Sequence, residues 1–147
     1  TNLMKKPSGN RHKSRELALK AIYQHLVGAK SLSNIMKEMP EQEEYAKADE
    51  EYFRQLTTQV FEHIADLDDR ISQFIDRDIN ALSPIEHAIL LISGYELIHD
   101  SSIPYRVAIN EGVELAKQYG GTDGHKYVNG VLDKLGAQAR PQEAVKR

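Results

Sequence analysis

Apolar residues recur at steps of three and four along the middle of this chain, the pattern of an amphipathic helix. The stripe lasts for more than five helical turns and consists of Phe53, Leu56, Val60, Ile64, Leu67, Ile71 and Phe74. So long a stripe must be buried against other elements. No run alternates at period two for the length of a strand. We therefore expect an all-α fold, a compact bundle of about six to seven helices.

The same pattern predicts two helices before the long one, a loop that leads into it, and one helix after it. A first helix is expected at about 14–29, and a short second one at 32–39, closed by a proline. The acidic segment 41–51 is weakly periodic and predicts a loop or a solvent-facing lead-in to the long helix. At 83–86 the sequence SPIE combines an N-cap serine, a proline at the first helical position and a capping-box glutamate. A helix is expected to begin there.

Residues 103–133 predict two helices separated by a Gly-Gly pair at 120–121. Pro104 suits a first helical position, and the glycines suit a left-handed cap. Thr122 or Asp123 can cap the second helix through a side-chain oxygen. Once the apolar side of that helix is assigned to the core, a cluster of polar and aromatic residues is left to explain: His125, Lys126, Tyr127, Asn129 and Asp133.

Composition sets the class of protein. A length of 147 residues with 28% charged and 40% hydrophobic residues suits one globular domain. There is no run of 18 apolar residues and no apolar segment behind the basic N-terminus, so we expect a cytoplasmic protein with no membrane contact. Because the sequence has no cysteine, disulfides, thiolate nucleophiles and cysteine-ligated zinc are excluded.

The charge is distributed unevenly. The net charge is -3, yet the first 15 residues hold five basic side chains and no acidic one. The remaining 132 residues hold 14 basic and 22 acidic groups. The simplest interpretation is a solvated basic tail. However, Arg11, Lys13 and Arg15 run into the first helix, where positive charge opposes the helix dipole, and this favours an anionic ligand.

Catalytic and cofactor chemistry find no support in the sequence. There is no phosphate-binding loop and no glycine fingerprint after a strand, and the six histidines share no metal-binding spacing. Adjacent carboxylates such as Asp68 and Asp69 point to different faces of a helix. Ser83 is better explained as a helix cap than as the nucleophile of a serine hydrolase. We expect no catalytic residue, no metal, no cofactor and no enzymatic activity.

Single-stranded RNA binding fits the residues that remain. Such sites combine cations for phosphates, aromatic faces for bases and polar groups for base edges. Lys126 adds a cation to the basic opening, Tyr127 offers a stacking face, and Asp123 or Asn129 can bond base edges or hydroxyls. The alternative is that Tyr127 packs in the core and Asp123 only caps a helix.

Three separated blocks resemble the NusB family of transcription antitermination factors. They are RHKSRELALKAIYQ at 11–24, SPIEHAILLISGYEL at 83–97, and PYRVAINEGVELAKQYGGTDGHKYVNGVLDK at 104–134. The resemblance implies a NusB-like fold of two packed helical sub-bundles. It also implies a factor that binds a boxA-type RNA together with NusE, a small-subunit ribosomal protein. Such a factor belongs to the RNA polymerase antitermination complex and supports antitermination of ribosomal RNA transcription.

The resemblance also assigns residues to two surfaces. The implied protein-partner surface contains Tyr23, Glu86 and His87, although Glu86 can also be explained as a capping-box residue alone. Tyr127 stands where the family has phenylalanine, and His12 and Lys13 replace arginines, which weakens the expected phosphate contacts. The full set expected to bind RNA is Lys5, Lys6, Arg11, His12, Lys13, Arg15, Asp123, Lys126, Tyr127 and Asn129.

The expected organisation is a basic, flexible arm at 1–10, one NusB-like domain at 11–136 and a polar tail at 137–147. Two alternatives stay open. A NusB-like helical domain also precedes the catalytic domain of a ribosomal RNA cytosine methyltransferase, which would need a large Rossmann-type domain after it. The other alternative is a helical protein-interaction module whose basic arm binds an acidic partner without RNA.

Overall fold

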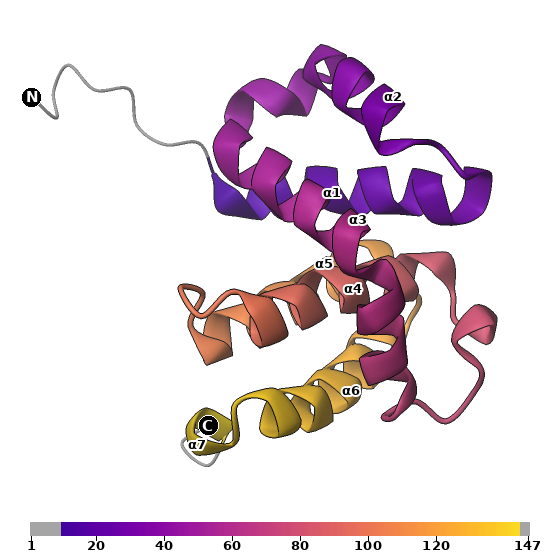
Figure 1. Cartoon of the computed structure of the whole chain (residues 1–147), viewed down its shortest axis with the longest axis vertical. Helices are drawn as coiled ribbons and strands as arrows, with labels where there is room; N and C mark the ends of the chain where they lie inside the picture. The colour runs from indigo at the N-terminus through magenta and orange to yellow at the C-terminus, as the bar shows by residue number, and fades with distance from the viewer. Residues whose placement is uncertain (1–9, 145–147) are drawn as a thin grey trace, which may run out of the picture. The chain divides into compact units, whose positions relative to one another are not determined.

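The computed structural model describes residues 10–144, which form seven α-helices and three short 3-10 helices without a strand (Figure 1). The prediction of an all-α fold is confirmed. The chain divides into two compact units, the first ending at Thr58 and the second beginning at Gln59. The division falls within helix α3 (Glu50–Ser72). Each unit is described by itself.

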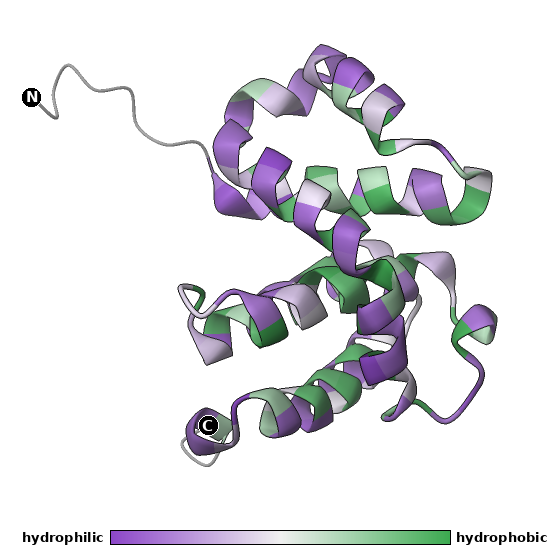
Figure 2. Ribbon diagram, viewed as in Figure 1, coloured by the Kyte–Doolittle hydropathy of each residue, from purple (hydrophilic) through white to green (hydrophobic). Residues whose placement is uncertain are grey.

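The first unit contains α1 (Arg11–Gly28), α2 (Leu32–Glu38), η1 (Met39–Glu41), η2 (Glu43–Lys47) and the start of α3. Helix α1 begins three residues before the predicted position. Part of the expected acidic loop is helical, because two 3-10 turns precede α3 and α3 itself begins at Glu50. Figure 2 shows both hydrophilic and hydrophobic residues along α1, whose middle turns are buried on all sides, from Ser14 to Leu19 and at Ala21 and Ile22.

Backbone and side-chain hydrogen bonds join the start of α1 to the acidic segment. The side chain of Asn10 caps α1 by accepting from Lys13 N at 3.2 Å, and Asn10 N donates to Lys47 O at 2.9 Å. The hydroxyl of Ser14 donates to the carbonyl of Asp49 at 2.6 Å. These bonds explain the early start of α1 and bring basic and acidic residues together.

The second unit contains the rest of α3, then η3 (Ile79–Ala81), α4 (Pro84–His99), α5 (Tyr105–Tyr119), α6 (Gly124–Ala139) and α7 (Pro141–Ala144). The predicted start of α4 is confirmed: Ser83 is the N-cap, its hydroxyl accepts from Glu86 N at 3.2 Å, and proline follows it. Helices α4, α5 and α6 contact one another.

Two glycines allow these helices to approach closely. A Cβ added at Gly112 would lie 2.3 Å from the hydroxyl of Ser93, and one added at Gly136 would lie 2.8 Å from the ring of Tyr105. Arg140, just after α6, donates to the carbonyls of Glu96, Leu97, Asp100 and Ile103 at 2.8 to 2.9 Å. It thereby binds carbonyls of the last turn of α4 and of the turn that follows it.

The turn between α5 and α6 differs from the prediction. Gly120 caps α5 with φ −86° and ψ 178°, and no described glycine has a positive φ, so the expected left-handed cap is wrong. Glycine is required there for space, because a Cβ would lie 2.7 Å from Ala116 O. Pro104 is the N-cap of α5, and the helix begins one residue later, at Tyr105.

Candidate nucleic-acid interface

At the start of α1, Arg11 is exposed and His12 and Lys13 are partly exposed, and all three have carboxylate neighbours. The guanidinium of Arg11 lies 3.7 Å from the carboxylate of Asp49 and stacks on the ring of Tyr52, 4.2 Å from its centroid. Asp49 immediately precedes α3, so the acidic segment supplies this partner. Arg11 can reach a phosphate only by exchanging that carboxylate for it.

Lys13 has two carboxylate partners. Its Nζ lies 3.2 Å from Glu16 and 3.4 Å from Glu44. The hydrogen bond and charge of Glu16, and then those of Glu44, raise the pKa of Lys13, while Lys13 lowers the pKa of Glu44. His12 Nε2 lies 3.8 Å from Glu16. The cations on this turn therefore oppose the helix dipole less than the sequence suggests, because neighbouring acids offset them.

Arg15 differs from the expectation that the first-turn cations are exposed. Its side chain is only 4% exposed, and its guanidinium lies 5.3 Å from the centroid of the Tyr52 ring. Burial of the charge removes it from the open surface, so a direct phosphate contact by Arg15 is not supported. Lys5 and Lys6 lie outside the described residues.

In the second unit, the start of α6 presents an acid and a base to solvent. Asp123 occupies the N-cap position, but its carboxylate makes no capping hydrogen bond. It instead lies 3.5 Å from Lys126 Nζ, and both side chains are about three-quarters exposed. The alternative in which Asp123 serves only as a side-chain cap is therefore wrong, and its oxygens are accessible to a ligand.

Tyr127 is half-buried, one turn into α6. Its hydroxyl donates to Asp76 Oδ1 at 3.4 Å, and the guanidinium of Arg77 lies 4.6 Å from its ring centroid. Burial, more than the neighbouring charges, raises the pKa of Tyr127. Asn129 follows on α6 and is also half-buried. The ring of Tyr127 is thus at the surface and not in the core.

The expected partner residues have different surroundings. Tyr23 is on α1 and 37% exposed. His87 is 9% exposed, and its Nε2 lies 2.7 Å from Asp68 Oδ1, so its imidazole fixes α4 to α3. The carboxylate of Glu86 lies against Gly124, where an added Cβ would be 2.8 Å from it. Glu86 therefore adjoins the positive N-terminal end of α6.

Several neighbours of the expected site residues were not anticipated from the sequence, among them Glu44, Asp76 and Arg77. Glu44 lies in a segment that reads as a solvated acidic loop. Asp76 and Arg77 lie between helices, where no periodic pattern gives their orientation. The only signal for these contacts in the sequence is the presence of charged residues in both segments, and charge alone does not specify which residues pair.

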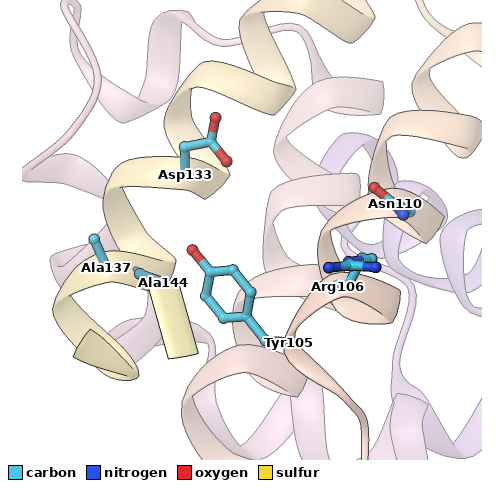
Figure 3. Close-up of a pocket in the computed structure, with 6 residues that line it drawn as sticks. All are labelled: Tyr105, Arg106, Asn110, Asp133, Ala137 and Ala144. Atoms are coloured by element: carbon cyan, nitrogen blue, oxygen red, sulfur yellow. The ribbon is translucent and has the colours of Figure 1, made fainter. Parts of the chain in front are cut away.

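The described residues offer little support for other chemistry. A cavity of about 490 Å³ opens beside α5, α6 and α7 (Figure 3), and none of the residues expected to bind RNA or NusE lines it; its lining residues are Tyr105, Arg106, Asn110, Asp133, Ala137 and Ala144. Between residues 10 and 144 no three side chains are arranged to hold a metal ion. Within the same range, no helix has the length and apolar run needed to cross a membrane.

Comparison with known proteins identifies the family. The sequence pattern of the NusB family matches residues 12–137. The chain belongs to the NusB family. It is 61% identical over 138 residues to the transcription antitermination protein NusB of Methylobacillus flagellatus, covering 94% of this chain and 90% of that protein.

Solved structures agree with the family and the fold. T. maritima NusB superposes with a TM-score of 0.80 at 30% identity, covering 96% of this chain and all of the other. A chain in the crystal structure of antitermination factors NusB and NusE in complex with dsRNA gives 0.75 at 26% identity, covering 87% and 96%. The NusB-like fold that the resemblance implied is confirmed.

Proposed function

We propose that this chain is a transcription antitermination factor that binds RNA together with NusE. The observation that carries the proposal is the family match over 12–137, joined to a relative of that name at 61% identity over nearly the whole chain. The related structure containing NusB, NusE and RNA supports both partners. The factor acts within the RNA polymerase antitermination complex, in the cytoplasm, on a boxA-type RNA.

Two groups of residues supply the RNA chemistry in this proposal. Arg11 and Lys13 bind phosphates after exchanging their carboxylate partners, and such exposed pairs are weak because water and salt screen them. Lys126 supplies a further phosphate contact. Tyr127 stacks a base, and Asp123 and Asn129 bond base edges or hydroxyls. Lys5, Lys6 and His12 add positive charge to this group. Arg15 is buried and is not assigned a phosphate contact; it lies near the ring of Tyr52, on which Arg11 stacks.

NusE binding is assigned to Glu86 and Tyr23. The family resemblance implies that NusE is basic, so the carboxylate of Glu86 can pair with it, and opposite charge speeds the encounter. His87 acts on this surface indirectly: through its bond to Asp68 it holds the first turn of α4, and with it Glu86, in place. Because Glu86 also adjoins Gly124, the NusE surface borders the RNA-binding start of α6 within the second unit.

The proposed activity is binding without catalysis. It is supported by relatives named transcription antitermination protein NusB, of which the chain covers 90% and 94% of the length. A purely protein-binding module is the remaining alternative, and RNA binding separates it from our proposal.

The test is a titration of a labelled boxA-type RNA with the full chain at several salt concentrations. If three or four phosphates are neutralised on a single strand, the logarithm of affinity falls against the logarithm of salt with a slope of roughly -2 to -3. A scrambled RNA and a duplex of the same sequence are measured in parallel, because the related complex contains double-stranded RNA. If none of the three RNAs shows salt-dependent binding, the protein-binding alternative is favoured.

A further inference from the structure

Asp76 and Arg77 lie between α3 and η3 and form a small cluster with Tyr127. Arg77 Nε donates to Asp76 Oδ1 at 2.9 Å, and the same oxygen accepts from the Tyr127 hydroxyl at 3.4 Å. The guanidinium lies over the Tyr127 ring, 4.6 Å from its centroid. One carboxylate oxygen therefore holds both an aromatic ring and the cation that covers it.

This cluster is exposed enough to exchange its partners. The side chain of Arg77 is 45% exposed and that of Asp76 is 73% exposed. Water and salt weaken an ion pair or a cation–π contact at such a position. A guanidinium can stack on a ring or bind a phosphate with two parallel hydrogen bonds, and these are the two contacts that single-stranded RNA offers.

We propose that Arg77 is a further RNA-contact residue. It covers the Tyr127 ring when RNA is absent. When a base stacks on that ring, the guanidinium moves aside and binds a phosphate of the same strand. This inference rests on the proposed RNA-binding function and adds to it a residue of the segment before α4. Without RNA, Asp76 holds Arg77 over the ring of Tyr127, and this contact breaks when RNA binds.

Arg77 already binds an anionic group, and a phosphate offers the same kind of partner. Hydrogen bonding to Asp76 raises the pKa of Arg77, and the charge of Glu86 contributes in the same direction. The guanidinium contacts the Asp76 carboxylate directly, so a phosphate can take the place of that carboxylate. Arg77 lies over the ring of Tyr127, which directly follows the exposed Lys126 on α6.

The first experiment compares Arg77→Ala, Arg77→Lys and Arg106→Ala in the RNA titration. Arg106 is an exposed arginine of the second unit, beside the α5–α6 cavity, and serves as the matched control. Arg77→Ala is expected to weaken binding roughly three- to tenfold and to make the salt slope shallower by about 0.7. Arg77→Lys keeps the slope but regains only part of the affinity, and Arg106→Ala binds as the unchanged chain does.

A second experiment uses the absence of tryptophan from the chain. Tyr127→Trp places one fluorophore at the stacking position, and a stacked base quenches it. In this background, Asp76→Asn releases the cover and is expected to tighten RNA binding about two- to fivefold. Adding Arg77→Ala leaves quenching at saturating RNA intact, since the base still stacks, but lowers the affinity.

Unchanged or tighter binding by a folded Arg77→Ala protein, with the same salt slope, would overturn the inference and leave Arg77 as a cover for the ring. If the unsubstituted chain shows no salt-dependent RNA binding, the proposed function itself fails. The two failures are therefore distinguished by the unsubstituted chain. A thermal melt of each variant verifies that it is folded.

Discussion

Tyr127 is the residue at which the RNA proposal can be tested most locally. Its ring is half-buried and contacts Asp76 and Arg77, so its removal leaves the helical core intact. Tyr127→Ala is expected to weaken RNA binding by about 1 to 3 kcal/mol, because a stacked base loses its platform. The measurement is fluorescence anisotropy of a labelled RNA, beside a thermal melt.

Tyr127→Phe is the matched control. It keeps the ring and loses only the hydrogen bond to Asp76, so RNA binding is expected to stay close to that of the unchanged chain. Equal binding by a folded Tyr127→Ala protein would assign the ring a structural role with Arg77.

His99 makes stability depend on pH in the second unit. Its ring lies 4.3 Å from that of His63, with Asp66 at 3.5 Å. Burial and then the charge of His63 lower the pKa of His99, and Asp66 opposes the change. Tyr95 packs beside both rings, and Arg70 adds a further unfavourable positive charge.

The sign follows from the lowered pKa of His99. Above the pKa of about 6.5 in the unfolded chain, His99 is neutral in both states. As the pH falls below this value, the unfolded chain binds the proton more readily, so the free energy of unfolding decreases until the pH passes the folded pKa. Between about pH 7.5 and 5.5, the free energy of unfolding measured by urea melts is expected to fall less in His99→Gln than in the unchanged chain. A loss of the same size in His99→Gln and in a His125→Gln control would contradict this explanation.

At the scale of elements, the acidic segment before α3 acts on the basic opening of α1. Asp49 pairs with Arg11, and Glu44 pairs with Lys13. The two segments are also joined by the backbone bond from Asn10 to Lys47. The carboxylates occupy positions that RNA phosphates would need, so this segment competes with RNA in our account.

Glu44→Gln is therefore expected to bind RNA more tightly, by roughly two- to fivefold, since one exposed ion pair no longer has to be exchanged. Glu43→Gln removes the same charge from the same turn and leaves the pair with Lys13 in place. Competitive titration with one labelled RNA compares the two variants. If both change the affinity equally, net charge and not the Lys13 pair is responsible.

Helix existence was predictable here, whereas side-chain partners were not. The stripe from Phe53 to Phe74 and the SPIE sequence at 83–86 predicted α3 and the start of α4, because periodicity and capping are local properties. Asn10 started α1 earlier than its apolar pattern suggested, through a capping bond that needs no apolar residue. The left-handed cap at Gly120 failed for a different reason: steric space required that glycine, and its φ is negative.

The candidate site was predictable only as a set of residue types. Arg11, Lys13, Lys126 and Tyr127 could be named from charge and from the family resemblance. Their neighbours could not, since Glu44 and Arg77 reach them across segments distant in sequence. Arg15 shows the same limit, because it is buried and one of its neighbours is Tyr52, which follows 37 residues later.

For the whole molecule, Glu86 tests whether NusE and RNA binding can be separated. Glu86→Lys is expected to weaken NusE binding by several kcal/mol if the contact is desolvated, because it places a cation opposite a basic partner. RNA binding in the absence of NusE is expected to change little. Calorimetric titration with NusE measures the first effect, and anisotropy measures the second.

Glu86 also adjoins Gly124, so charge reversal is expected to cost up to about 1 kcal/mol of stability at the N-terminus of α6. A thermal melt separates this loss from an effect on binding. Glu114→Lys makes the same charge change at an exposed position of α5 and serves as the control. Equal NusE affinities for folded Glu86→Lys and Glu114→Lys proteins would leave Glu86 with a structural role only.

The central claim is that one chain binds RNA and NusE and couples them. The most direct measurement is calorimetric titration of NusE into the unsubstituted chain, with and without a saturating boxA-type RNA, completed by RNA titration with and without NusE. Positive coupling must be reciprocal, so each ligand is expected to raise the chain's affinity for the other by the same factor, about five- to 150-fold. Independent binding of the two ligands, or failure of either to bind, would contradict the account.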